Sequence, residues 1–248
     1  MILVNALGVI DSGGIVVLDK FLCESSDLTR SLAGVAIRQG RVKVNGKPQR
    51  SASLKIDEKS DLVLLNDMPL ACDIGPRYFM MNKPEGYICA NTDEEHRVVF
   101  SLMQDEINLH KLHTVGRLDL DTTGLLFITD DGQFSHVVVS PKHHLEKTYR
   151  AWLAEPLIDN AEEQVEAGIL LKSESEKTKP GKLERISDTE VLISIGEGRY
   201  HQVKRMFRAV GNRVHALHRE SIGNIRLDIG LGEWRYLTID EINSFGRR

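Results

Sequence analysis

The sequence predicts an α+β protein in which a small α/β domain precedes a larger domain built on a mixed, mainly antiparallel sheet. Residues 18–65 carry helical periodicity and then a hairpin signal, and residues 66–77 are rich in turn-forming residues. From Tyr78 onward, strand-like runs mix with helical ones, which fits an antiparallel sheet better than a repeating β-α-β pattern. A length of 248 residues with a hydrophobic content of 41% is enough for buried cores in one or two domains.

Composition narrows the class of protein. The formal net charge of −4 excludes a chain that is basic overall, but it leaves room for a local basic surface. The three cysteines form no C-x-x-C pair, so we expect neither a disulfide framework nor a zinc site, and a cytoplasmic location fits. No apolar stretch approaches membrane-spanning length, so we expect no membrane association.

Residues 1–17 are predicted to be an N-terminal extension whose origin the sequence does not give. They are apolar, but Asp11 interrupts them and they lack the basic start of a signal peptide. We assign no function to them.

Two helices are predicted at the start of the small domain. Residues 18–22 place leucine and phenylalanine at helical spacing. A second helix is expected to begin at a cap, Asp27 or Thr29, and to end at Gly40. Its inward side chains are expected to be Leu32, Val35 and Ala36.

A hairpin is predicted to follow these helices. Val42 and Val44 alternate with polar residues before Asn45-Gly46, a strong signal for a two-residue turn between strands. Residues 61–67 are a further strand candidate.

The hairpin region is also strongly basic. Between residues 38 and 50 there are five positive side chains and no acid. They are Arg38, Arg41, Lys43, Lys47 and Arg50. Such a run is either a solvated face or a surface that binds the phosphates of RNA or DNA.

The larger domain is expected to span residues 78–248, after a linker at residues 66–77 that contains two prolines and a glycine. Its predicted strands lie within residues 77–82, 123–129, 147–153, 190–195 and 233–239. Its predicted helices lie within residues 160–168 and 200–211.

Two carboxylates stand out in this domain. Asp119 and Asp121 lie between leucines, in a segment that otherwise has the pattern of a strand. In strand geometry the two aspartates share one face, while Leu118 and Leu120 share the other. A divalent-metal site, a turn stabilised by aspartate side chains, and a catalytic carboxylate are all open interpretations. A carboxylate in a partly apolar cleft is costly unless it is paired, so we expect a cationic partner.

Residues 197–219 offer that partner. They contain six Lys and Arg, three His and a single acid. Val203, Met206, Phe207 and Val210 have helical spacing and form a core-facing side. The basic face is either solvated or in contact with nucleic acid, for which Arg205 and Arg208 are candidates, and one inward cation remains for the carboxylate. The histidines lack a zinc-binding pattern, because no cysteine lies near them.

Four blocks of the sequence resemble the signature blocks of the RNA pseudouridine synthases, and they occur in the same order. The blocks are YFMMNKPEGYICA at residues 78–90, GRLDLDTTGLLFITDDG at 116–132, PKHHLEKTY at 141–149 and EGRYHQVKRMF at 197–207. Residues 18–65 resemble the S4-like RNA-binding domain that precedes the catalytic domain in one branch of that family. The resemblance implies a catalytic domain with a central cleft.

The resemblance also implies roles for single residues. Asp119 matches the catalytic aspartate, whereas Asp121 is expected to shape the loop. Lys204 matches the basic residue that pairs with that aspartate. Tyr149, which periodicity alone makes a core aromatic, matches the tyrosine that packs against the target base and assists proton removal. Substrate-binding positions are implied for Arg117, Val203 and His201.

The implied reaction is the isomerisation of a uridine in ribosomal RNA to pseudouridine, after the uridine is flipped into the cleft. The block at Tyr200-His201-Gln202 favours small-subunit (16S) rRNA, free or in an assembling subunit, over large-subunit rRNA. No metal or cofactor is expected, and the chain is expected to act as a monomer. Two alternatives from other classes are a non-catalytic RNA-binding protein and a metal-dependent transferase that uses Asp119 and Asp121.

Overall fold

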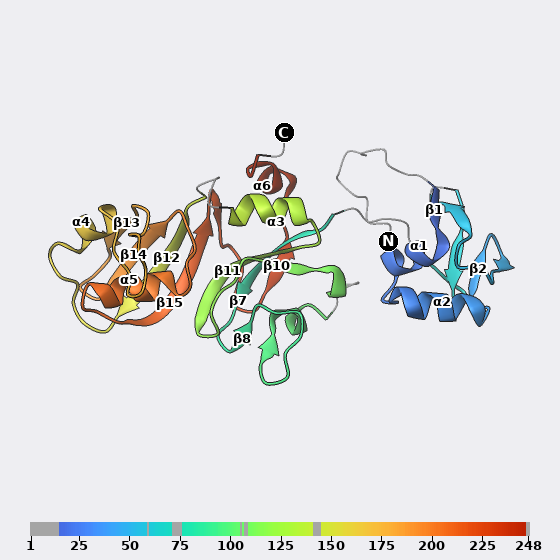
Figure 1. The fold of residues 1–248 in the computed structure, drawn as a ribbon, viewed down its shortest axis with the longest axis horizontal. Helices are drawn as coiled ribbons and strands as arrows, with labels where there is room; N and C mark the ends of the chain where they lie inside the picture. The colour runs from blue at the N-terminus through green and yellow to red at the C-terminus, as the bar shows by residue number, and fades with distance from the viewer. Residues whose placement is uncertain are drawn as a thin grey trace. The chain divides into compact units, whose positions relative to one another are not determined.

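The computed structural model describes residues 15–58, 60–70, 76–104, 106, 109–140 and 145–246. These fall into two compact units, one within residues 1–76 and 104–111 and one within residues 77–103 and 112–248 (Figure 1). We call them unit 1 and unit 2. Most of the predicted extension, residues 1–14, lies outside the described residues.

Unit 1 combines two α-helices and a single-turn 3₁₀ helix with short strands. The helices are α1 (Leu18–Ser25), α2 (Arg30–Arg38) and the single-turn η2 (Leu109–Lys111). The strands are β1 (Ile15–Val17), β2 (Val42–Val44), β3 (Lys47–Pro48), β4 (Lys55–Asp57), β5 (Val63–Leu65) and β6 (Met68–Pro69). They form a four-stranded sheet in the order β3-β2-β5-β6 and a separate pair of β1 with β4.

The second helix begins where the sequence predicts it, but it turns a different face inward. The hydroxyl of Thr29 accepts a hydrogen bond from the backbone N–H of Leu32, at 3.4 Å, and so caps α2. The prediction that Leu32 points inward is wrong, because its side chain is 52% exposed. Ala36 is buried as predicted, Ala33 and Ile37 are buried in place of Leu32, and the two small alanines allow α2 to pack closely on α1.

The hairpin is confirmed, and its turn has the expected backbone conformation. Asn45 and Gly46 have φ values of 50° and 77°, as a two-residue turn with both central residues left-handed requires. The linker predicted at residues 66–77 was too broad, because part of it forms a strand. Met68–Pro69, in the stretch predicted to be a linker, pairs with β5 and extends the same sheet.

The predicted extension also enters the fold at its end. Ile15–Val17 form β1, which pairs antiparallel with β4. Val16 is 9% exposed and packs on the core of unit 1. The S4-like part of the chain therefore includes backbone pairing that begins before Leu18.

Unit 2 is built on one large sheet. Its main path runs β13-β14-β12-β15-β11-β7-β17, with β10 paired to β11 and β16 paired to β15. These strands are β7 (Tyr78–Lys83), β10 (His113–Val115), β11 (Thr122–Thr129), β12 (Lys147–Leu153), β13 (Lys182–Arg185), β14 (Glu190–Ile195), β15 (Val214–Ile222), β16 (Ile225–Arg226) and β17 (Trp234–Tyr236). The remaining elements are β8 (Tyr87–Ile88), β9 (Arg97–Val98), η1 (Val99–Leu102), α3 (Gly132–Val139), α4 (Ala161–Glu166), α5 (Gln202–Ala209) and α6 (Ile239–Asn243).

The predicted fold class is confirmed, since every ladder of the large sheet is antiparallel except the one between β11 and β15. At this parallel contact the two backbones lie very close. A Cβ atom on Gly124 would fall 2.3 Å from the carbonyl oxygen of Arg219, and Gly124 has a φ of +105°. Only glycine fits there, so Gly124 fixes where β11 meets β15.

Two helices cover one face of this sheet beside β11, as Figure 1 shows for α3 and α6. Phe134 of α3 and Phe245, just after α6, stack edge to face with ring centroids 5.4 Å apart, and both contact Phe127 of β11. Asp131 caps α3 by accepting hydrogen bonds from the backbone N–H groups of Gln133 and Phe134. Within the described ranges, no helix combines the length and the apolar character needed to cross a membrane.

Candidate active site

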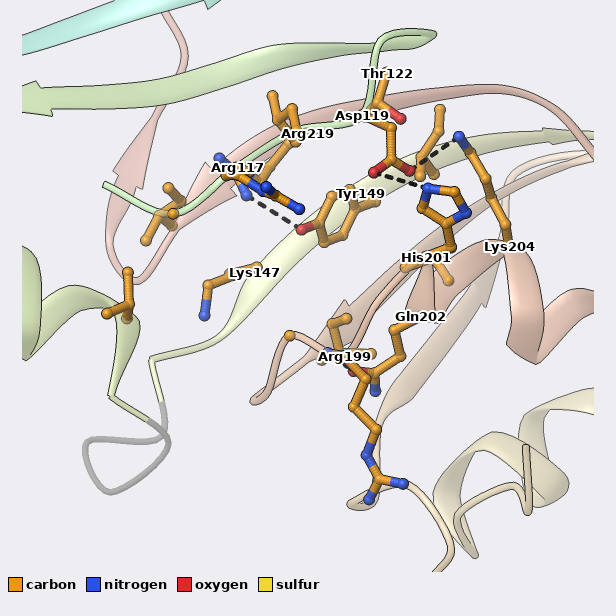
Figure 2. A pocket seen from close by; sticks show the side chains of 18 of the residues that line it. Arg117, Asp119, Thr122, Lys147, Tyr149, Arg199, His201, Gln202, Lys204 and Arg219 are labelled. Carbon is orange, nitrogen blue, oxygen red and sulfur yellow. Dashed lines mark hydrogen bonds and ion pairs between the residues drawn. The ribbon is translucent and has the colours of Figure 1, made fainter. Parts of the chain in front are cut away.

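A pocket of about 210 Å³ opens on unit 2 where four elements meet. They are the loop of residues 116–121, strands β12 and β15, and the start of α5. Figure 2 shows the ring of Tyr149 near the middle of this pocket, with charged side chains on both sides of it. The charged lining residues are Arg117, Asp119, Lys147, Arg199, His201, Lys204 and Arg219.

The two aspartates lie on a turn between β10 and β11, so the predicted strand geometry is wrong here. The carbonyl oxygen of Asp119 accepts a hydrogen bond from the backbone N–H of Thr122, at 3.1 Å, which closes the turn. Leu118 is 6% exposed and Leu120 is 40% exposed, so the two leucines do not share a face. One leucine anchors the loop while the aspartates project from it.

A fully buried lysine holds this loop in place. The ammonium group of Lys83 donates to the carbonyl oxygens of Thr122 at 2.8 Å, Pro84 at 3.0 Å and Leu120 at 3.4 Å. Burial lowers the pKa of Lys83, because no adjacent carboxylate compensates fully for the lost hydration. Lys83 therefore acts through the backbone of the aspartate loop.

Asp119 is bound from two sides. Its carboxylate lies 3.1 Å from Nζ of Lys204 and 3.3 Å from Nε2 of His201. The same Lys204 ammonium lies 2.5 Å from a carboxylate oxygen of Asp121. Asp121 thus shares the cation, which the sequence did not predict; its role in shaping the loop stays a prediction.

The shared cation changes the protonation behaviour of this cluster. Burial alone would lower the pKa of Lys204, but hydrogen bonds to Asp121 and Asp119 outweigh it and raise that pKa. Burial would likewise raise the pKa of Asp121, and the hydrogen bond from Lys204 outweighs it and lowers that pKa. Both groups are therefore charged at neutral pH.

The start of α5 presents His201 in a strained conformation. His201 has φ +46° and ψ +37°, a left-handed conformation that is uncommon outside glycine, although asparagine, aspartate and histidine adopt it more often than other residues. The loop before it is fixed by Gln202, which accepts from the backbone N–H of Arg199 at 2.8 Å and donates to Glu197 at 2.9 Å. The ring of Tyr200, which is 70% exposed, stacks on the imidazole with centroids 3.8 Å apart. The backbone geometry therefore aims the imidazole at Asp119.

The other side of the pocket is basic. Tyr149 on β12 faces Arg219 on β15, and Nη1 of Arg219 donates to the tyrosine hydroxyl at 3.3 Å. Lys147 lies on the same face of β12, two residues before Tyr149, and lines the pocket. Burial, reinforced by the charge of Arg219, lowers the pKa of Lys147 from 10.5 to about 8.

The two remaining predicted pocket residues also line the cavity. Val203 is 4% exposed and supplies an apolar wall. Arg117 is exposed, and its side chain makes no hydrogen bond or ion pair with the described residues. The structure therefore brings all six predicted catalytic and substrate-binding residues to one pocket.

The predicted RNA-contact residues lie outside this pocket and differ in how they are engaged. Arg205 donates to the carbonyl oxygen of Lys172 at 2.9 Å and pairs with Glu174 at 2.9 Å, so much of its guanidinium is occupied. Arg208 is exposed and lines a smaller pocket with Arg213 and His215. Whether Arg205 contacts RNA stays a prediction.

The basic cluster of unit 1 is exposed for the most part. Arg41 donates to the side chain of Asn66, Lys43 pairs with Asp67, and Lys47 extends from β3. Arg50 donates to the carbonyl oxygen of Arg38 at the end of α2. Arg38, Arg41, Lys43, Lys47 and Arg50 all belong to unit 1.

Sequence reasoning missed three polar residues of the pocket: Lys147, Thr122 and Arg219. Thr122 and Arg219 each bury a polar atom, Oγ1 and Nη2 respectively, that has no hydrogen-bond partner in the part of the chain that the structure describes. Lys147 could have been found from strand alternation with Tyr149, since residues two apart share a face. Arg219 could not, because its strand β15 was not predicted.

The geometry does not favour a metal site at Asp119 and Asp121. The Lys204 ammonium already supplies both carboxylates with a positive charge. Among the described residues, no group of three or more His, Cys, Asp or Glu side chains is arranged to hold a metal ion.

Comparison with known proteins agrees with this site. The family model for RNA pseudouridylate synthase matches residues 77–209, and the model for the S4 domain matches residues 18–63. A crystal structure of a pseudouridylate synthase superposes with a TM-score of 0.67 at 47% identity, covering 93% of this chain and 99% of that one.

Curated proteins give the same answer. Ribosomal small subunit pseudouridine synthase A of Escherichia coli strain K12 is 51% identical over 229 residues, covering 92% of this chain and 98% of that protein. The protein of that name from Vibrio cholerae is also 51% identical with the same coverage, and the one from Haemophilus influenzae is 48% identical, covering 91% and 97%. The chain therefore belongs to the RNA pseudouridylate synthase family, the isomerases that its four sequence blocks predict.

Proposed function

We propose that this enzyme isomerises one uridine in the RNA of the small ribosomal subunit, 16S rRNA, to pseudouridine. The observation that carries the proposal is the carboxylate of Asp119, bound by Lys204 and His201 at a pocket that contains Tyr149. The names of the relatives reported above support the small subunit as the source of the RNA.

The reaction needs a carboxylate and a shaped pocket. The bond between uracil N1 and ribose C1′ breaks, the uracil turns, and its C5 bonds to C1′, with no net oxidation or group donation. Asp119 acts as nucleophile or base in this sequence, and Lys204 balances its charge. Tyr149 and Val203 hold the uracil, with Tyr149 placed to assist removal of the C5 proton. No metal or cofactor is required by this chemistry.

A uridine that is paired or stacked in folded RNA cannot reach Asp119, so the enzyme flips it out. Unstacking costs a few kcal/mol. Arg117, whose side chain is exposed at the pocket, is available to fill the vacated space or to hold the flipped nucleotide. His201, which contacts the carboxylate of Asp119, is also expected to contact the substrate.

Contacts to the RNA backbone would offset the cost of flipping. Unit 1 supplies five basic residues for this, and unit 2 supplies Arg208 and, in part, Arg205. The unit 1 residues are Arg38, Arg41, Lys43, Lys47 and Arg50. We further propose that the protein acts as a monomer in the cytoplasm, where free thiols such as Cys23 and Cys89 stay reduced.

Tritium release from 5-tritiated uridine tests the reaction and its substrate together. The full chain is incubated with small-subunit and, separately, large-subunit ribosomal RNA, each as free RNA and in assembling particles. We expect release from the small-subunit RNA only. Release only from large-subunit RNA would assign the enzyme to the other subunit, and binding without release would favour a non-catalytic RNA-binding protein. Turnover that persists in EDTA would exclude the alternative function of a metal-dependent transferase.

Asp121→Asn is the matched control for Asp119→Asn, because both side chains contact Lys204. Asp119→Asn should lower turnover by about 10⁴-fold or more, since it removes the reacting group itself. Asp121→Asn should keep turnover within about tenfold of wild type, the loss of an exposed ion pair. Retained turnover in Asp119→Asn would sink the assignment.

A further inference from the structure

Arg219 is a buried cation with an unused hydrogen-bond donor. Its side chain is 3% exposed, Nε donates to the carbonyl oxygen of Leu125 at 2.7 Å, and Nη1 donates to the hydroxyl of Tyr149 at 3.3 Å. Nη2 is buried and has no hydrogen-bond partner among the described residues. Guanidinium groups cannot be deprotonated in proteins, so this donor stays charged.

No carboxylate neutralises Arg219 within the described part of the chain. None of the ion pairs of those residues includes it, and Lys147, the pocket residue whose pKa its charge lowers, is also a cation. An unpaired charge away from water is costly, and a buried donor left unsatisfied adds to that cost. A protein that retains both in a pocket is arranged for a ligand that brings an acceptor and negative charge.

The burial of Arg219 in the pocket indicates which part of a bound nucleotide it contacts. An RNA chain continues on both sides of a flipped nucleotide, so its phosphates stay at the opening of the pocket. A group as buried as Arg219 therefore meets the base. Figure 2 shows Arg219 at the hydroxyl end of the Tyr149 ring, while Asp119 and Lys204 lie on the opposite side. If the ribose faces Asp119, the carbonyl edge of a uracil lying on Tyr149 faces Arg219.

We propose that Arg219 is a catalytic residue whose Nη2 donates to a carbonyl oxygen of the target uracil and stabilises the uracil anion formed in the reaction. This deepens the proposed function and rests on it. When the N1–C1′ bond breaks, its electron pair stays on uracil and spreads from N1 to O2 and O4. C5 then attacks C1′ and afterwards gives up its proton, N1 takes one up, and the overall proton count is unchanged.

The pocket favours this anion at the stage where it forms. Donors fixed before the reaction need no rearrangement as charge develops, and they act strongly where water is excluded. Lys147 adds positive charge on the same side, and it would bind an anion more tightly in its protonated form. Tyr149, held by Nη1, keeps the guanidinium plane in position beside the base.

A leaving-group experiment separates this role from a structural one. Single-turnover cleavage of the N1–C1′ bond is measured for wild type and Arg219→Met on small-subunit RNA with uridine or 5-fluorouridine at the target position. Fluorine withdraws electrons and stabilises the uracil anion by itself. Arg219→Met should therefore slow the uridine substrate by about 10²- to 10³-fold and the fluorinated substrate by about tenfold or less. RNA affinity should change little.

The controls keep each outcome interpretable. Arg226→Met removes an exposed arginine on β16 that does not line the pocket, and it should leave both rates unchanged. Arg219→Lys gives the same comparison with the charge kept, should Arg219→Met fail to fold, and its loss should also be larger for uridine. Equal losses on both RNAs, or no loss on uridine, would overturn the role of Arg219. Wild type that is inactive on uridine would instead overturn the proposed function, and this inference with it.

Discussion

The two ends of the pocket handle charge in opposite ways. At the carboxylate end, defined by Asp119, Asp121, His201 and Lys204, every acid has a basic partner within 3.3 Å. At the cation end, defined by Arg117, Lys147 and Arg219, no acid is present among the described lining residues. The ring of Tyr149 lies between the two ends (Figure 2).

The charges at the carboxylate end are paired within the protein, whereas those at the cation end are paired only when the substrate binds. The carboxylate end is internally paired, so its geometry is fixed before RNA arrives. The cation end carries a buried donor without a partner among the described residues and a lysine whose pKa is lowered by burial. Such a surface costs stability in the free protein and gains it back when an acceptor binds. Substitutions at the two ends should therefore differ in sign for stability while agreeing in sign for activity.

Apart from loss of Asp119 itself, the largest effect should come from Lys204→Met, which breaks the pairing at the carboxylate end. The two carboxylates would then face each other without their shared cation, and charge preorganisation around Asp119 would be lost. We expect turnover to fall by about 10²- to 10³-fold, with a smaller change in RNA affinity. The measurement is tritium release under single-turnover conditions beside an RNA-binding titration.

Lys204→Arg is the matched variant, because it keeps the positive charge. It should recover most of the lost turnover. Unchanged kinetics in Lys204→Met would show that Asp119 does not depend on this ion pair. The pKa of Lys204 is raised, so the stability it adds is present below pH 10.5 and is lost as pH rises through its folded pKa. The wild-type advantage in unfolding free energy should fade only in strongly alkaline buffer.

An intermediate effect, of opposite sign for stability, is expected from Lys147→Met at the cation end. Burial lowers the pKa of Lys147 to about 8, so between pH 8 and 10.5 the unfolded chain binds more protons and stability rises with pH. Removing the charge should stabilise the protein at pH 7 by up to about 2 kcal/mol, a value already discounted for partial exposure. Turnover should nevertheless fall.

Denaturant unfolding at pH 7 and at pH 10.5 measures this effect. The stability gained by Lys147→Met should shrink towards zero at the higher pH, where the folded wild-type lysine is neutral and the unfolded one is about half neutral. Lys182→Met serves as the control, since Lys182 is exposed on the edge strand β13. If Lys147→Met lowers stability at pH 7, the cation end is not the unfavourable surface described above.

The contrast between the ends also explains what the sequence could and could not predict. The helix that carries Lys204 has a simple pattern, with Val203, Met206, Phe207 and Val210 at helical spacing, and all four are buried. That pattern predicts an inward edge where a cation can meet a carboxylate. The partner Asp119 came from family resemblance, because no local pattern links residues so far apart in the chain.

The residues of the cation end were harder to predict from the sequence, and the reason is physical. Strand β15 alternates buried and partly exposed residues, but its inward position 219 is an arginine and its other positions include two histidines. A strand whose buried face carries charge does not show the alternation of apolar and polar residues by which strands are recognised. Unsatisfied functional groups are placed where local patterns fail.

Unit 1 shows a different kind of error, in which the helix was predicted correctly but one of the side chains that it turns inward was not. The helix α2 was predicted with its cap, yet Leu32 is exposed and Ala33 is buried. Apolar character alone favours leucine as the inward residue. Close packing of α1 on α2 favours the smaller side chain, and periodicity within a nine-residue helix is too short to decide between them.

The smallest effect should come from substitutions of His201. Two of them distinguish the contribution of its backbone conformation from that of its side chain at the carboxylate end. Asparagine tolerates the left-handed conformation that His201 adopts, whereas valine does not. His201→Asn should therefore keep the unfolding free energy within about 0.5 kcal/mol of wild type, while turnover falls about tenfold through loss of one hydrogen bond to a charged group. His201→Val should show that same loss of turnover plus a loss of about 1–2 kcal/mol in stability. Thermal unfolding and tritium release on the two variants test this. Equal stabilities would mean that the strained backbone costs nothing, and full activity in His201→Asn would mean that Lys204 alone pairs the carboxylate that the reaction uses.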